Sequence, residues 1–308
     1  MFYRDKISPY PTEDSIIGNY KVSTTIIATK SSIVYKGFNQ NGNKVVLKFL
    51  KITELNENHV KTEISLLHQL NHPNIVKLIE DFPYPPYHCA VMEWAPYGSL
   101  DLLVDPSRPF GLNELTVQLI TFQLLKGLHF LHKQHIWHRD MKLENVLVFD
   151  NNLESPFVKI SDFGLAVNAS NIKPNDRVGS NGYVAPEIVK GDSYDEKVDL
   201  WSLGVIVYRL LSGEFPFPND TSFNSRKQLL MGKFSFLKEK WDTRSKEVIN
   251  FIDNLLVVDP SKRMSASEAL NHPWISSFEK KSCCALTEVE HLICPLQLAI
   301  DFTPDILT

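Results

Sequence analysis

The pattern of hydrophobic and polar positions divides the chain into a strand-rich first part and a helical second part. Between residues 20 and 94 most hydrophobic runs are short, rich in β-branched residues and bounded by turn signals, which is typical of strands. Residues 43–51, NKVVLKFLK, form such a run next to the hairpin signal NGN. Residues 75–94 predict two more strands separated by the turn sequence YPPY. We therefore expect a β-sheet in the first part of the chain.

Spacing of three and four residues predicts the helices. In the strand-rich part, residues 57–70 have hydrophobic positions at i, i+4 and i+7, namely Val60, Ile64 and Leu67. Further on, residues 114–136 predict a long apolar helix. Its hydrophobic positions on or near one face are Leu115, Leu119, Phe122, Leu125 and Leu128. The segments around 196–212, 245–256 and 265–270 continue the helical character.

These elements divide the chain into four segments. Residues 1–18 are polar, contain two prolines and are interpreted as an N-terminal leader. Residues 19–94 form a small β-rich lobe, and residues 95–275 form a larger helical lobe. Residues 276–308 form a C-terminal tail. A sheet lobe followed by a helical lobe is a known way to form a cleft between two layers of structure.

Composition excludes several classes of protein. With 308 residues, 43% of them hydrophobic, the chain can bury one large core or two smaller ones. Its net charge of −4 argues against a nucleic-acid-binding protein. Four cysteines are too few for a disulfide scaffold, and none forms a C-x-x-C metal pair. The N-terminus lacks a signal peptide, and the apolar segment 201–211 is about half the length of a transmembrane helix. We expect a soluble, cytoplasmic protein, with nuclear entry not excluded.

Four motifs occur in a fixed order along the chain: VVLK at 45–48, HRDMKLEN at 138–145, DFG at 162–164 and APE at 185–187. The pattern H-R-D-x-x-x-x-N alone specifies four residues and arises by chance on the order of once in 10⁵ positions. On these motifs the sequence resembles the eukaryotic protein kinase family over roughly residues 19–275.

Two further features narrow this resemblance. Lys142 and the sequence LNHPWI at 270–275 resemble the serine/threonine kinases of the calmodulin-dependent and AMP-activated group. The resemblance implies an α+β, two-lobed protein kinase fold, with a small β-rich N-lobe that carries one main helix and a larger helical C-lobe. It also implies ATP and Mg²⁺ as cofactors and Ser/Thr hydroxyls of proteins as phosphate acceptors.

The resemblance implies a role for each catalytic residue. Phosphoryl transfer spreads negative charge over the transferred group, so the protein must supply cations, metal ligands and an oriented nucleophile. Asp140 would orient the substrate hydroxyl and accept its proton. Lys48, expected in the third strand, would pair with the α- and β-phosphates, and Glu63 would hold Lys48 there. Lys142 lies beside Asp140 and would steady the γ-phosphate.

Asn145 and Asp162 are the implied metal ligands, because hard oxygen ligands suit Mg²⁺. Each of these residues alone has an ordinary structural explanation. An Asp before Phe-Gly is commonly part of a turn, and a Lys–Glu pair at the surface contributes about 0–1 kcal/mol. The ordered set of motifs, rather than any one residue, argues for catalysis.

The resemblance also implies a nucleotide pocket. Three apolar side chains would sandwich the adenine, a fourth would lie at the back, and two backbone positions would bond the adenine edge. The same apolar side chains suit an ordinary core equally well. In that order, the residues are Val34, Val46, Leu147, Met92, Glu93 and Ala95.

The loop expected over the phosphates lacks glycine. The family pattern G-x-G-x-x-G falls on Ile27, Thr29 and Ser32. Glycine lets backbone N–H groups approach phosphate closely, so its loss predicts roughly ten- to several-hundred-fold weaker use of ATP. One hypothesis is that the hydroxyls of Thr29, Ser31 and Ser32 and the cation of Lys30 replace the lost contacts. The alternative is a loop that has drifted because phosphate contact no longer matters.

Positions outside the nucleotide pocket bear on regulation and on the scaffold of the site. Asp176 lies where many relatives carry a phosphorylated Thr, and its carboxylate could pair with Arg139 without phosphorylation. Ser180 matches a family Thr that bonds the catalytic Asp and Lys. Two more expected contacts support the frame: a buried ion pair between Glu187 and Arg263, and a bond from Asp199 to the catalytic-loop backbone.

Two positions near the active site and the C-terminal tail bear on the choice of substrate and on calmodulin binding. Glu144 matches a position that receives a basic side chain upstream of the phosphorylation site, whereas Ser99 replaces a second acidic residue. We therefore expect a weak preference for upstream Arg or Lys. The tail from 276 to 308 is acidic on balance, whereas calmodulin targets are basic amphipathic helices, so calmodulin binding is not expected.

Two functional classes remain open at this point. The complete set of Lys, Glu, Asp, Asn and Asp favours an ATP-dependent protein serine/threonine kinase, with weakened ATP affinity as one form of it. The glycine-free loop favours a pseudokinase, a scaffold that binds protein partners without catalysis. A small-molecule kinase is disfavoured by the APE motif and the peptide-docking segment before it.

Overall fold

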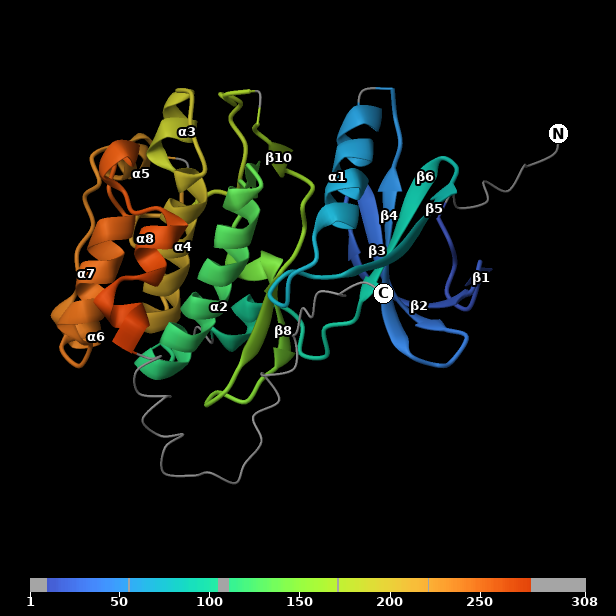
Figure 1. Cartoon of the computed structure of the whole chain (residues 1–308), viewed down its shortest axis with the longest axis horizontal. Coiled ribbons are helices and arrows are strands. Elements are labelled where there is room, and N and C mark those ends of the chain that lie inside the picture. Colours follow the sequence, from blue (N-terminus) through green and yellow to red (C-terminus); the bar gives the residue numbers. More distant parts are fainter. Residues whose placement is uncertain (1–9, 55, 105–110, 171, 221, 278–308) are drawn as a thin grey trace, which may run out of the picture.

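The computed structural model describes residues 10–54, 56–104, 111–170, 172–220 and 222–277. A β-sheet with one helix packed on it forms one lobe, and a larger helical unit lies beside it (Figure 1). This is the predicted two-lobed α+β kinase fold, which is thereby confirmed. Of the predicted tail, only Ser276 and Ser277 are among the described residues.

The small lobe is built on a six-stranded sheet in which all hydrogen-bonded neighbours are antiparallel. The strands, in sheet order, are β1 (Ile16–Ile17), β2 (Tyr20–Ala28), β3 (Ser32–Asn39), β4 (Lys44–Lys51), β6 (Tyr87–Glu93) and β5 (Leu78–Tyr84). The sheet thus begins inside the segment interpreted as a leader. Because β1 is counted, Lys48 lies in the fourth strand and not in the third as expected.

Period-two alternation in β4 separates the core of the lobe from the cleft. Val45, Leu47 and Phe49 are buried in the core of the sheet. Val46 and Lys48 point to the other face, because successive side chains of a strand alternate. Helix α1 (Glu57–Gln69) covers part of that other face, as the helical spacing predicted (Figure 1).

The large lobe packs around two long helices, α2 (Glu114–Lys133) and α4 (Lys197–Ser212). Helix α2 buries part of the predicted set: Leu125 and Leu128 are fully buried as expected, whereas Leu119 and Phe122 are only partly buried. Leu115 is 49% exposed because it lies in the first turn of the helix. Its backbone amide donates to the side chain of Asn113, which caps this turn. The fully buried hydrophobic residues of α2 are Val117, Ile120, Leu124, Leu125, Leu128 and Leu131.

Short elements complete the large lobe and carry the motifs. The helices are α3 (Pro186–Lys190), α5 (Phe223–Leu230), α6 (Lys238–Trp241), α7 (Lys246–Leu255) and α8 (Ala266–Leu270). The 3₁₀ helices are η1 (Leu100–Leu103), η2 (Leu143–Asn145) and η3 (Pro260–Lys262). Two separate antiparallel strand pairs are formed by β7 (Ile136–Trp137) with β10 (Val167–Asn168) and by β8 (Val146–Asp150) with β9 (Phe157–Ile160). Within the described ranges, no helix combines the length and hydrophobicity needed to cross a membrane.

Candidate active site

A lysine on β4 joins two carboxylates from distant parts of the chain. The Lys48 ammonium lies 2.7 Å from Glu63 Oε1 on α1 and 2.7 Å from Asp162 Oδ1 in the DFG motif. Lys48 and Glu63 are largely buried, whereas 47% of the Asp162 side chain is open to solvent. The predicted Lys48–Glu63 contact is therefore present, and it draws α1 against the cleft.

Neighbouring charges shift the pKa values of Lys48 and Asp162. Burial disfavours the charged ammonium, but the carboxylates of Glu63 and Asp162 outweigh it and raise the pKa of Lys48. The nearby Lys48 charge lowers the pKa of Asp162 to about 2, against the opposing effect of burial. Asp162 is thus an anion at neutral pH, which is the form that can ligate a divalent cation.

The catalytic loop holds Asp140 in a buried position between Asn145 and Lys142. Asn145 Nδ2 donates to the Asp140 carbonyl at 2.8 Å and to its Oδ2 at 3.0 Å. The Lys142 ammonium lies 2.9 Å from the same Oδ2 and donates to Ser180 Oγ at 2.7 Å. Asp140 Oδ1 is buried and has no hydrogen-bond partner among the described residues. A buried unpaired acceptor is costly unless something else binds it, and a substrate hydroxyl would do so.

Asp199 on α4 holds the backbone of this loop, as expected. Its carboxylate accepts hydrogen bonds from the amides of His138 at 2.9 Å and Arg139 at 2.8 Å. Burial opposes its ionisation, but the hydrogen bond and charge of His132 and the contacts from His138 outweigh it and lower the pKa of Asp199. Arg139 has φ of +65°, which is unusual for a residue other than glycine. Asp199 therefore stabilises a strained backbone next to Asp140.

Asn145 and Asp162 suit a Mg²⁺ ion chemically. The hydrogen bonds described for the Asn145 side chain are donated by Nδ2, which leaves Oδ1 available as a ligand. Asp162 supplies an ionised carboxylate that faces the open cleft. Asn145 contacts Asp140, and Asp162 contacts Lys48, whose positive charge would balance that of a phosphate chain. The residues present thus fit a metal-bound nucleotide.

The residues predicted to contact adenine lie on β3, β4, β6 and β8 and in the segment after β6. Val34 is paired with Lys48 across β3 and β4, and Val46 is paired with Met92 across β4 and β6. Val34, Val46, Met92 and Leu147 are only partly buried, so they are not part of the buried core.

The segment after β6 offers the expected backbone groups. Glu93 is held by its side chain, which accepts from the Lys159 ammonium at 2.7 Å and from the Lys77 amide at 2.7 Å. In the described part of the chain, the Ala95 amide has no hydrogen-bond acceptor. Leu147 on β8 faces this segment through a bridge with Ser99. A flat heterocycle with its own acceptor would satisfy the Ala95 amide.

Comparison with known proteins decides the family. A family model described as a protein kinase domain matches residues 20–275. The chain belongs to the protein kinase family. The family predicted from the motifs is thereby confirmed, and so is the resemblance to the calmodulin-dependent group of serine/threonine kinases.

Individual kinases are similar over most of this chain. Myosin light chain kinase A of Dictyostelium discoideum is 39% identical over 254 residues, which cover 80% of this chain and 84% of the relative. Serine/threonine-protein kinase H1 of Mus musculus is 37% identical over 227 residues, or 72% of this chain and 52% of the relative. DNA damage response protein kinase DUN1 of Saccharomyces cerevisiae is 35% identical, over 73% of this chain and 48% of the relative. The chain thus spans about half the length of the last two kinases.

The activation segment of this kinase is held by an aspartate. A single guanidinium nitrogen of Arg139 lies 2.8 and 2.9 Å from the two carboxylate oxygens of Asp176. The contact predicted between these residues is therefore present. Tyr194 completes it, because its hydroxyl donates to Asp176 at 2.9 Å and accepts from Arg139 at 2.9 Å. Sequence reasoning missed Tyr194, since nothing in the sequence around it indicates that its ring returns to the activation segment.

We expect replacement of Asp176 with alanine to lower kcat by about 3- to 10-fold, because the Arg139 side chain loses the partner that orders the activation segment. Steady-state phosphorylation of a Ser/Thr peptide would measure this change. Replacement with glutamate keeps the charge and serves as the matched control. Full activity of the alanine variant would show that the contact does not matter for catalysis.

The glycine-free loop is a tight turn at the end of the β2–β3 hairpin. Ile27 on β2 pairs with Val34 on β3, and the turn between them holds Thr29, Lys30 and Ser32. The Thr29 hydroxyl bonds to atoms of the turn itself, whereas the hypothesis gave it to phosphate. Lys30 is exposed at the tip, and its contact with phosphate stays a prediction.

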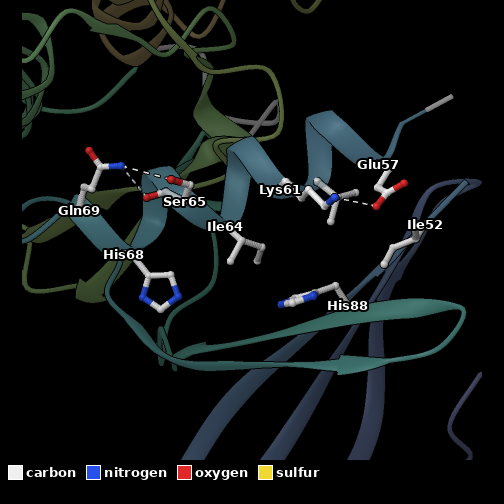
Figure 2. Close-up of a pocket in the computed structure, with 9 residues that line it drawn as sticks. Ile52, Glu57, Lys61, Ile64, Ser65, His68, Gln69 and His88 are labelled. Atoms are coloured by element: carbon white, nitrogen blue, oxygen red, sulfur yellow. Dashed lines mark hydrogen bonds and ion pairs between the residues drawn. The ribbon is translucent and has the colours of Figure 1, made fainter. Parts of the chain in front are cut away.

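A separate cavity of about 490 Å³ lies outside the cleft, between α1 and the sheet (Figure 2). Ile52, Ile64, His68 and His88 point into it from the strands and the helix. The Asp81 carboxylate on β5 accepts hydrogen bonds from both histidine rings, from His68 Nε2 at 2.5 Å and from His88 Nε2 at 2.6 Å. This shared carboxylate ties the end of α1 to β5 and β6, on the helix that carries Glu63. It was not predicted, since these residues belong to no motif.

Glu144, the residue expected to meet a basic substrate side chain, is exposed on η2 next to the catalytic residues. Its exposure leaves the carboxylate free for an external cation. The preference for upstream Arg or Lys stays a prediction.

Proposed function

We propose that this chain is an active protein serine/threonine kinase that transfers the γ-phosphate of ATP to protein Ser/Thr hydroxyls. The observation that carries the proposal is the Lys48 ammonium at 2.7 Å from both Glu63 and Asp162, because this contact exists only when α1, β4 and the DFG motif are assembled around the cleft. Asp140, with one buried carboxylate oxygen unpaired in the described structure, supports the same reading.

In the proposed mechanism each residue has one task. The cations Lys48 and Lys142 balance phosphate charge, while Asn145 and Asp162 would hold Mg²⁺, which neutralises the charge that develops on the phosphates. Asp140 orients the acceptor hydroxyl through Oδ1 and takes its proton as the bond to phosphorus forms. Because Asn145 and Lys142 both contact Oδ2, the carboxylate cannot rotate freely, and Oδ1 is left for the substrate.

The test is transfer of labelled γ-phosphate from ATP with Mg²⁺ to a mixed Ser/Thr peptide library. The control is Asp162→Ala, which removes a metal ligand and also frees Lys48 from one of its two carboxylates. We expect transfer by the unchanged protein and a loss of at least 100-fold in the control, within the range measured for single catalytic groups. Omission of Mg²⁺ should abolish transfer in both.

The second candidate is a pseudokinase scaffold, which the glycine-free turn from Thr29 to Ser32 favours. A scaffold would give no transfer above the Asp162→Ala control even at millimolar ATP. That result would overturn the proposed activity and leave protein binding as the function of the fold.

A further inference from the structure

The turn between β2 and β3 satisfies its own backbone groups. The Thr29 amide donates to the Ser32 carbonyl at 2.8 Å, and the Ser31 carbonyl accepts from the Lys51 amide on β4 at 2.8 Å. The Thr29 hydroxyl accepts from the amides of Ser31 at 3.3 Å and Ser32 at 3.0 Å, and it lies 3.1 Å from the Ser32 carbonyl, to which it donates. The hydroxyls of Ser31 and Ser32 also lie 3.4 and 3.1 Å from it, so every hydrogen-bond partner described for the Thr29 hydroxyl belongs to the turn itself.

The amides of Ser31 and Ser32, which donate to this hydroxyl, lie at the tip of the nucleotide loop. Strand β3 carries Val34 opposite Lys48 on β4, and Ser32, two residues closer to the tip, lies opposite Leu50, so the tip is two residues along the sheet from the pair that contains Lys48. Backbone N–H groups of a tight turn are ready donors to an anion, and the corresponding loop of protein kinases covers the ATP phosphates. A phosphate oxygen and the Thr29 hydroxyl oxygen are acceptors for the same kind of donor.

We propose that the Thr29 hydroxyl competes with the phosphates of ATP for the amides of Ser31 and Ser32. This inference rests on the proposed nucleotide binding and assigns Thr29 the opposite role to that of a phosphate ligand. A glycine at this position could not compete, because it has no side chain. Thr29 then lowers the affinity for ATP, because its hydroxyl accepts hydrogen bonds from the loop amides until a phosphate oxygen replaces it as their acceptor.

The expected size of the effect follows from where the turn lies. Thr29 and Ser31 are exposed and Ser32 is half-buried, so water also competes for their hydrogen bonds and each bond contributes little net free energy. Removal of the hydroxyl should therefore tighten ATP binding by about 3- to 10-fold rather than by orders of magnitude. The change should be confined to ligands that carry phosphates, since adenosine does not reach the tip.

The experiment is calorimetric titration of the full chain with ATP in the presence of Mg²⁺, and with adenosine. Thr29→Val removes the hydroxyl but keeps the β-branched shape, and Thr29→Ser keeps the hydroxyl as the matched control. Thr29→Ala is a second variant without the hydroxyl, and thermal unfolding checks that each variant is folded. We expect a Kd for ATP that is about 3- to 10-fold lower in Thr29→Val and Thr29→Ala. Thr29→Ser should match the unchanged protein, and adenosine should bind all four proteins equally.

The outcomes separate this inference from the proposed activity. If the unchanged protein binds ATP and Thr29→Val binds it equally or more weakly, the competition is overturned while nucleotide binding stands. An equal gain for adenosine also overturns it, because the effect would not pass through the phosphates. If none of the four proteins binds ATP, the inference and the proposed function fail together.

Discussion

Replacement of Asp140 with asparagine will lower kcat by roughly 10²- to 10⁴-fold, the range for loss of a positioned general base. Asparagine has nearly the same shape and keeps an acceptor oxygen, but it cannot take a proton from the substrate hydroxyl. The contacts from Lys142 and Asn145 to the other side-chain atom will also change, because an amide nitrogen cannot accept their hydrogen bonds. Steady-state phosphorylation of a Ser/Thr peptide will measure kcat, and calorimetric titration will measure ATP binding.

The matched control is Asp150→Asn, which changes an exposed carboxylate at the end of β8 by the same chemistry. Asp150 accepts a hydrogen bond from the Asn152 amide, and asparagine can accept it too. We expect full activity in that variant and unchanged ATP binding in both. A fall of less than threefold in kcat for Asp140→Asn would mean that Asp140 is not the base.

The second large effect concerns stability. The Arg263 side chain is fully buried and its two terminal nitrogens lie 2.7 and 3.0 Å from the two carboxylate oxygens of Glu187. Replacement of Glu187 with methionine leaves the guanidinium buried without its counter-charge, which costs about 3–5 kcal/mol of the free energy of unfolding. Urea unfolding followed by circular dichroism will measure the loss.

A double variant distinguishes the unpaired charge from lost packing. Glu187→Met combined with Arg263→Met removes both charges and should unfold at a higher urea concentration than Glu187→Met alone. The recovery will be partial, because the carbonyls of Lys197 and Val257 also lose the arginine as donor. A loss below about 1 kcal/mol in the single variant, as for an exposed ion pair, would contradict the prediction that the unpaired Arg263 charge destabilises the fold.

The sequence predicted contacts in which one residue belongs to a motif and the family resemblance implies its partner. The pairs Lys48–Glu63, Arg139–Asp176 and Glu187–Arg263 all form as expected. In each case the motif contains the first residue, and the resemblance to the protein kinase family gave the position of the second. The side chain that closes the Asp176 cluster, Tyr194, lay outside every motif and could not be predicted.

Predictions from local pattern were weaker where a turn or a helix end decides the orientation. Leu115 fits the apolar spacing of α2 but lies in its first turn, so it faces solvent. The missing glycines of the nucleotide loop were evident from the sequence. The direction of the Thr29 hydroxyl was not, because it depends on the dihedral angles of a turn whose amides have more than one possible acceptor.

The aspartate that faces Arg139 has a consequence for how long the contact lasts. A phosphate at this position is added after synthesis and can be hydrolysed, whereas the Asp176 carboxylate is encoded and permanent. No phosphatase can reverse it, and no upstream enzyme is needed to create it. The charge that faces Arg139 is therefore present in every copy of the chain from its synthesis onward.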